Sequence, residues 1–188
     1  MTTAADEVIA QTRIWIERAV IGLNLCPFTK AVYVKEQIRY VVSGARNRDE
    51  LLADLERELA TLEDASPDDI DTTLLIHPAA MEDFLDYNDF LELADALIAQ
   101  MDLEGEVQVA GFHPRFQFAG TKPDDITNYT NRSPYPTLHL LREASVDAAV
   151  AAFPDAEKIY EKNMESLRKL GIAGWLALGI ELHSDRKH

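Results

Sequence analysis

The sequence predicts a fold of the α+β or α/β class, in which a single-layer mixed sheet of about four strands is packed by helices. Short β-branched and aromatic runs alternate with longer segments whose apolar residues recur every three or four positions. Strand–helix–strand units of this kind favour layered folds with some parallel pairing. A ferredoxin-like arrangement is one candidate for the order of the strands.

Length and composition indicate one domain. The chain has 188 residues, of which 47% are hydrophobic, and this is enough to bury a core of ordinary size. No linker or low-complexity segment divides it. We therefore expect a single globular domain over residues 1–188, with the last residues, about 183–188, frayed.

The N-terminal segment is predicted to be an amphipathic helix over residues 5–23, because its apolar residues recur at helical spacing. Pro27 ends this helix or prevents its extension, since proline lacks the amide hydrogen that a helix requires. Residues 37–43 (QIRYVVS) are rich in β-branched and aromatic side chains and are followed by Gly44. They predict the first strand.

Two further helices flank the second predicted strand. Asn47 and Glu50 form a capping-box pattern that begins a helix extending to about Leu62. Residues 72–76 (TTLLI) form a short apolar run closed by His-Pro, which predicts a buried strand. A helix over about 82–101 follows, with its apolar residues again at helical spacing.

The C-terminal half is predicted to add two strands and two helices. Residues 107–112 (VQVAGF) and 138–141 (LHLL) are the strands, and a Pro-rich loop joins them. Ser145 caps a helix of about eight residues, and Pro154 begins a long helix that Gly171 stops.

The charge of the chain narrows the classes of partner. A formal net charge of −15 argues against nucleic acids and anionic membrane surfaces, because both bind to cationic surfaces. It permits a small anionic molecule, which a local cationic pocket can bind in an acidic protein. It is also compatible with a homodimer.

The compartment is inferred from cysteine usage and from the N-terminus. Cys26 is the single cysteine, so no intramolecular disulfide can form. The N-terminus lacks the basic and apolar regions of a signal peptide, and no apolar run approaches the roughly 20 residues that span a bilayer. We therefore expect a cytoplasmic protein.

Residues 111–143 concentrate the polar chemistry of the chain, with four Lys or Arg against three Asp or Glu. A guanidinium, an amide and a hydroxyl together suit a carboxylate or a phosphate, so we predict that this segment recognises an anionic metabolite. The predicted ligand-binding residues are Asn131, Arg132, Ser133, Tyr135, Arg115 and Arg142. The alternative is a loop held together by its own polar groups, with the flanking arginines in ordinary salt bridges.

Three histidines are associated with predicted strands. His77 and His113 each follow a strand in a His-Pro pair, whereas His139 lies inside one. If the first two strands run parallel as neighbours, these two imidazoles emerge at one sheet edge, where ligands bind in open α/β sheets. We predict His113 or His139 as the general acid or base of a small-molecule enzyme. The alternative is that each imidazole hydrogen-bonds a backbone carbonyl.

The same histidines suggest a second hypothesis, a metal-dependent hydrolase or oxygenase. His77, His113 and His139 would together bind zinc or iron as a three-histidine site. No H-E-x-x-H or H-x-H pattern enforces this arrangement. A divalent metal is therefore one option among others, and the cofactor is left open.

A third hypothesis is a non-catalytic interaction module that docks a partner through the aromatic loop. It requires the aromatic residues of this region to be exposed as one patch. They are Phe112, Phe116, Phe118, Tyr129 and Tyr135.

Cys26 is formally a candidate nucleophile, since histidines occur elsewhere in the chain. It lies near the C-terminal end of a predicted helix, where the helix dipole disfavours a thiolate. Its neighbours Leu25 and Phe28 indicate burial. A structural role is therefore favoured over a redox, nucleophilic or ligand-lining role.

Several blocks of the sequence together resemble the bacterial DUF1415 family. They are GLNLCPF, TTLLIHP, DFLDYNDFL, FHPRFQF, NRSPYPTLHLLRE and IYEKNMESLRKLG. The resemblance covers nearly the whole chain, and NRSPYPTLHLLRE is its most specific block. It implies a free-standing single-domain bacterial protein, but it implies no reaction, substrate or site residue.

Overall fold

A computed structural model describes residues 3–153 and 155–183. Its strands are β1 (Ile38–Val42), β2 (Thr72–Ile76), β3 (Val107–Phe112) and β4 (Thr137–Arg142). Its α-helices are α1 (Ala4–Trp15), α2 (Thr29–Val34), α3 (Arg48–Asp64), α4 (Phe84–Gln100), α5 (Glu143–Ala152) and α6 (Ile159–Ala177). A π-helix, η1 (Ile16–Ile21), and two 3₁₀-helices, η2 (Ile126–Asn131) and η3 (Ala156–Lys158), complete the helical segments. Within the described ranges, no helix combines the length and apolar character needed to cross a membrane.

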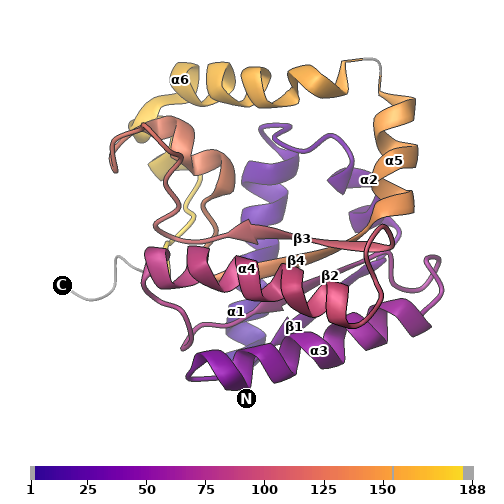
Figure 1. The fold of residues 1–188 in the computed structure, drawn as a ribbon. Coiled ribbons are helices and arrows are strands. Elements are labelled where there is room, and N and C mark those ends of the chain that lie inside the picture. Colours follow the sequence, from indigo (N-terminus) through magenta and orange to yellow (C-terminus); the bar gives the residue numbers. More distant parts are fainter. Residues whose placement is uncertain (1–2, 154, 184–188) are drawn as a thin grey trace.

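The four strands form one open mixed sheet in the order β1-β2-β4-β3. β1 and β2 are parallel, whereas β4 is antiparallel to both β2 and β3. This confirms the predicted α+β class, with one layer of sheet packed by helices (Figure 1). The ferredoxin-like candidate is wrong, because β1 and β2 are parallel neighbours and the last strand enters the sheet between β2 and β3.

Each face of the sheet carries its own hydrophobic core. α3 and α4 cover one face, below the sheet in Figure 1. Four of the five leucines of α3 are fully buried there: Leu51, Leu55, Leu59 and Leu62. On the other face, α1, η1 and the chain after α6 pack mainly over β1 and β2.

The first helix changes type along its length. Thr3 and Asp6 form a capping box at the start of α1, which ends at Trp15 and continues as η1. Segments of π-helix are rare and occur frequently at functional sites. Trp15, at the junction, contacts Phe112 of β3 edge to face, with ring centres 5.2 Å apart.

The Pro-rich segment between β3 and β4 is folded onto the body of the protein. Asn128 lies at its centre and is completely buried. Its side-chain carbonyl accepts hydrogen bonds from the amide of Phe118 and the hydroxyl of Thr121, and its amide donates to the carbonyl of Lys122. This packing includes η2, which the sequence did not predict and which supports α6.

α5 and α6 form an arch above the sheet (Figure 1). α5 rises from the end of β4, and α6 runs back across the molecule and packs on η2. None of the α5 residues from 143 to 152 is buried, although this helix is rich in alanine and valine. The arch therefore has an apolar helix that packs only lightly against the protein.

The predicted stop at Gly171 is found as a break within α6. The backbone there has φ 65° and ψ 173°, a conformation that is essentially restricted to glycine, and the chain then resumes a helix to Ala177. Replacing Gly171 by Ala is expected to lower the free energy of unfolding by about 1–3 kcal/mol, measured by urea denaturation. Gly44→Ala is the control, because a Cβ at Gly44 meets open space and its φ is not positive. Equal losses in both variants would contradict this account.

Some predictions for the chain ends fall outside the described residues. These are Pro154 as the start of the last helix and residues 184–188 as a frayed end. His183, in contrast, is held in place, because its amide donates to the carbonyl of Pro134 at 2.7 Å.

Candidate functional site

Arg132, the central residue of the predicted anion site, forms its hydrogen bonds within the protein. Its side chain is buried, and its Nε and one terminal nitrogen donate to the carbonyls of Phe116 and Pro123 at 3.1 and 2.6 Å. Its guanidinium also lies 4.4 Å from the centre of the Tyr129 ring. These contacts join three parts of the loop, so the donors of Arg132 are directed at the loop itself.

The two flanking arginines lie apart from Arg132. Arg142 donates to carbonyls at the end of α3 and in the loop after it, those of Leu62, Ala65 and Ile70. It therefore stabilises the C-terminus of that helix, where a cation is favoured. Arg115 is exposed and donates to the carbonyl of Glu82.

The remaining predicted ligand-binding residues also bond within the chain. Asn131 donates to the backbone carbonyl of Gly111, and the hydroxyl of Ser133 donates to the backbone carbonyl of Tyr135. Tyr135 is buried, and its hydroxyl donates to the side chain of Gln11 at 2.5 Å. The structure thus does not bring the six predicted residues together around one cavity.

His77 and His113 lie at the same edge of the sheet, although their strands are not neighbours. β2 and β3 run parallel with β4 between them, so both strands end on the same side. Both imidazoles pack against Tyr87 of α4, with ring centres 5.8 and 5.1 Å from it. His77 Nδ1 donates to the carbonyl of Ala80, and His113 Nε2 donates to that of Met81.

Both of these histidines are enclosed. Burial lowers the pKa of each to about 4, so both are neutral at physiological pH. His113 has both ring nitrogens engaged, because its Nδ1 accepts the amide of Arg115. His77 Nε2 is buried without a hydrogen-bond partner among the described residues. Neither ring is open to a ligand in this arrangement.

His139 faces the other side of the sheet. Its ring contacts Phe112 at 6.0 Å and bonds Thr72, whereas His77 and His113 pack against α4 on the opposite face. The three histidines proposed as metal ligands are therefore not brought together. No cluster of three or more His, Cys, Asp or Glu suited to a metal ion is found in the part of the chain that the structure describes.

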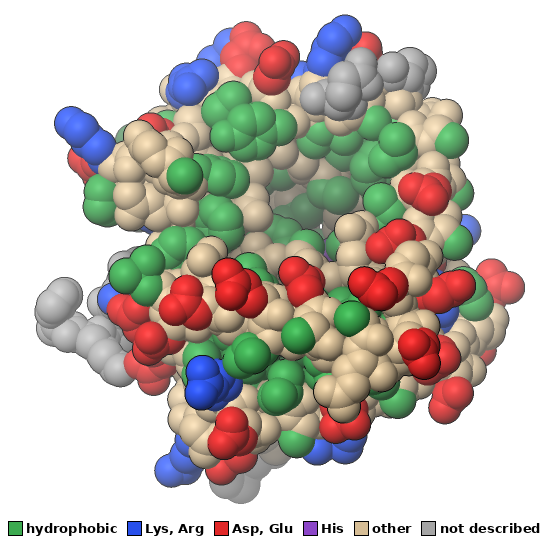
Figure 2. All heavy atoms as spheres, viewed as in Figure 1, with side chains coloured by type: hydrophobic (Ala, Val, Ile, Leu, Met, Phe, Trp, Pro, Cys, Tyr) green, Lys and Arg blue, Asp and Glu red, His purple; other side chains and the backbone are tan. Residues whose placement is uncertain are grey.

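The surface between the arch and the sheet is hollowed (Figure 2). Most side chains within this hollow are hydrophobic, and α6, α5 and the β3–α4 region frame its mouth. Acidic side chains gather along α4 below it, and the exposed ones on this helix include Asp86, Asp89, Glu92 and Asp95. The hollow is thus apolar inside and acidic at its lower rim.

The β3–β4 half of the sheet forms the floor under the arch. On this face, Ala110 and Phe112 of β3 alternate with His139 and Leu141 of β4, and all four remain partly exposed. Leu74 and Ile76 of β2 on the same face are buried in the core with α1. Helical cover is therefore thinner over the half that holds His139. We call these four β3 and β4 residues the floor.

His139 has a defined tautomer. The Thr72 hydroxyl donates its proton to the carbonyl of Leu140 at 2.6 Å, and its oxygen lies 2.7 Å from His139 Nε2. Since this proton is already used, Nε2 must carry a hydrogen and donate to the hydroxyl. Nδ1 is then an acceptor, and it has no hydrogen-bond partner among the described residues. The surrounding sheet lowers the pKa of His139 to about 4, so the ring is neutral.

Thr72 was not among the residues predicted from the sequence. The signal for it is weak, because a threonine at the start of an apolar strand is ordinary. Thr72 becomes informative only once the strand register is known. It pairs with Leu141 of β4, and Leu74, two residues further along β2, pairs with His139.

The aromatic loop residues do not form an exposed patch. Tyr135 is buried, and Phe112, Phe116, Phe118 and Tyr129 are half-buried. Their rings pack on other rings, for example Phe116 on Phe118 at 4.9 Å and Tyr129 on Trp175 at 4.8 Å. The docking hypothesis therefore lacks the surface that it requires.

Cys26 is a half-buried free thiol in the turn after η1.

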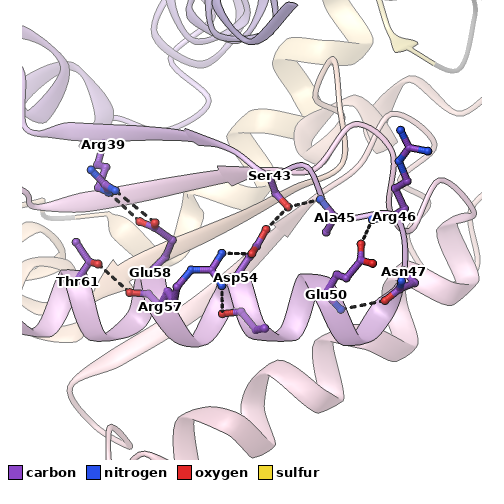
Figure 3. A network of polar contacts seen from close by, with 11 residues as sticks. Arg39, Ser43, Ala45, Arg46, Asn47, Glu50, Asp54, Arg57, Glu58 and Thr61 are labelled. Atoms are coloured by element: carbon purple, nitrogen blue, oxygen red, sulfur yellow. Dashed lines mark hydrogen bonds and ion pairs between the residues drawn. The ribbon is translucent and has the colours of Figure 1, made fainter.

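A second cavity, of about 380 Å³, lies at the C-terminal end of β1, lined in part by Ser43, Asp54 and Glu58. Figure 3 shows that its carboxylates are already paired. Asp54 accepts the Ser43 hydroxyl at 2.5 Å and pairs with Arg57, while Glu58 pairs with Arg39 at 2.8 Å. This network joins β1 to α3, and its groups are directed at one another.

Comparison with known proteins identifies the family. The family described as "Protein of unknown function (DUF1415)" matches residues 7–177. The chain belongs to the DUF1415 family. No curated protein and no solved structure shows a significant match to it.

The DUF1415 match contains every part of the hollow. It runs from α1 to the end of α6, and so it includes the sheet, Thr72, His139 and both helices of the arch. The chain after Ala177 lies beyond the match, although Ile180 and Leu182 are buried in the core over β1 and β2. The hollow is thus built by the DUF1415 region itself.

Proposed function

We propose that this DUF1415 protein binds a small, largely apolar molecule in the hollow under the arch, with His139 as its polar contact. The observation that carries the proposal is the combination of an apolar concave surface with one oriented polar group, His139, on the face of the sheet beneath it. Small-molecule sites typically have this composition, with hydrophobic walls and a few placed polar atoms.

His139 also gives the site a capacity for proton transfer. A neutral imidazole whose Nε2 is oriented by a hydroxyl can accept a proton at Nδ1. If the bound molecule is transformed, His139 is the group that we assign to this role. This revises the anionic-metabolite hypothesis, since the side chains expected to bind an anion hydrogen-bond elsewhere in the chain.

We further propose that the protein works in the bacterial cytoplasm. Cys26, the single cysteine of the chain, keeps a free thiol, which suits a reducing compartment.

Filling the floor tests the proposal. Ala110→Leu adds a large side chain beside His139, so it should weaken binding of toluene and phenol about tenfold, measured by NMR titration of the floor amides. Ala99→Leu is the control, because Ala99 is exposed on α4, which packs on the opposite face of the sheet. Failure of both probes to shift the floor amides, or equal binding by Ala110→Leu, would rule out the hollow as the site.

A further inference from the structure

We infer that the hollow selects molecules that carry a neutral or cationic hydrogen-bond donor on an apolar body, such as a phenol-like hydroxyl, and rejects carboxylates and phosphates. This inference rests on the proposed function, because it specifies the class of molecule that the same hollow binds. Two independent features support it: the direction of the hydrogen bonds at His139 and the charge around the mouth.

The first feature is a chain of hydrogen bonds with one polarity. The carbonyl of Leu140 can only accept, so the Thr72 hydroxyl donates to it and must in turn accept from His139 Nε2. Because the neutral ring carries its single hydrogen on Nε2, Nδ1 has a lone pair and can only accept a hydrogen bond. A lone pair attracts a donor and repels the oxygens of an anion.

The position of Thr72 keeps this chain of bonds in place. Thr72 is 3% exposed and lies in a strand paired on both sides, with β1 and with β4. The position of the Thr72 side chain is therefore fixed by the strands on both sides of β2. We regard Thr72 as a positioning residue, because it acts on a bound molecule only through His139.

The second feature is the electrostatic setting. The floor residues Ala110, Phe112 and Leu141 carry no charge, and the lowered pKa of His139 keeps its ring neutral near pH 7. The rim along α4 is acidic, and the whole chain has a formal net charge of −15. An anion reaching the floor would lose its hydration without gaining a cation there, and Lys162 of the arch is already paired with Asp155 at 3.7 Å.

Three probes of similar size test the inference on the intact protein: toluene, phenol and benzoate. Floor amides are followed by NMR, and affinities are compared in the wild type and in His139→Phe, which keeps a ring but removes the acceptor. The preference for phenol over toluene should fall about tenfold in the variant, because the hydroxyl is then buried without a partner. Benzoate should leave the floor amides unshifted.

Thr72→Val and Thr72→Ser extend the test and serve if His139→Phe does not fold. Thr72→Val removes the acceptor for Nε2–H, so the ¹⁵N shifts of the His139 ring should show that the tautomer is no longer fixed. The preference for phenol should fall, while Thr72→Ser should restore both readouts.

The outcomes separate the two proposals. Binding of phenol and toluene with a ratio unchanged by His139→Phe, or by Thr72→Val in its place, overturns selection of a donor and leaves binding in the hollow intact. Benzoate binding more tightly than phenol overturns the rejection of anions. If none of the three probes shifts the floor amides, the proposed function itself fails.

Discussion

Acidification is expected to destabilise this protein between pH 6.5 and about 4. His77 and His113 are buried as neutral rings with folded-state pKa values of about 4, whereas the unfolded chain takes up protons near pH 6.5. In that window the unfolded state binds more protons, so the free energy of unfolding falls as the pH falls. Above pH 6.5 these two residues give no pH dependence.

The size of the effect follows from the same shift. Each fully buried histidine can account for up to about 3 kcal/mol, since one pKa unit corresponds to about 1.4 kcal/mol. His139 should contribute in the same direction, because burial also lowers its pKa to about 4. Urea denaturation at a series of pH values from 7.5 down to the acid limit measures the combined loss.

A substitution isolates the contribution of one ring. His77→Phe keeps an aromatic ring beside Tyr87 but cannot be protonated, so its stability should depend less steeply on pH in this window. The carboxylates are the same in both proteins and cancel in the comparison. An unchanged slope in His77→Phe would show that the acid sensitivity arises elsewhere.

Arg132→Ala is expected to destabilise the protein by about 3 kcal/mol or more. Removing the guanidinium leaves the carbonyls of Phe116 and Pro123 without their charged donor and opens space against Tyr129. Thermal and urea unfolding measure the loss. The sequence alone, in contrast, predicted Arg132 to be a ligand-binding residue.

Arg115→Ala is the matched control for this prediction. It removes an exposed arginine from the same loop, and surface substitutions of this kind usually change stability by less than about 0.5 kcal/mol. If Arg132→Ala were as stable as Arg115→Ala, the structural role of Arg132 would be refuted.

Local patterns were sufficient to predict the main elements. Residues 72–76 and 107–112 have few polar side chains and many β-branched ones, and the strands β2 and β3 coincide with them. Even the shared edge of His77 and His113 was predictable, because strand direction decides which ends meet. The assumption that the strands are neighbours was not needed, since β4 between them preserves their common direction.

The role of the polar loop could not be predicted in the same way. An arginine among Asn, Ser and Tyr can donate hydrogen bonds to an anion or to backbone carbonyls equally well. The sequence does not show which carbonyls will lie near it. Arg132 meets the carbonyls of residues nine and sixteen positions away, a contact that depends on the path of the whole loop. Similarly, the face on which His139 lies depends on the register of β4.

The arch was also beyond prediction from periodicity. An apolar helix such as α5 indicates that a face will be covered, but it does not identify the covering element. In the structure its residues 143–152 are not buried, and only the spatial arrangement reveals the hollow that they border.

The position of β4 has a consequence for how the chain acquires its fold during synthesis. β4 is the last strand in the sequence, yet it occupies an inner place in the sheet and provides the pairing of β3 and one edge of β2. Until residues 137–142 leave the ribosome, β3 has no strand to pair with and β2 exposes unpaired backbone groups. Assembly of the sheet must therefore wait until about three quarters of the chain has been made. Before that point the nascent chain exposes strand edges with unpaired backbone groups, which favour aggregation or chaperone binding.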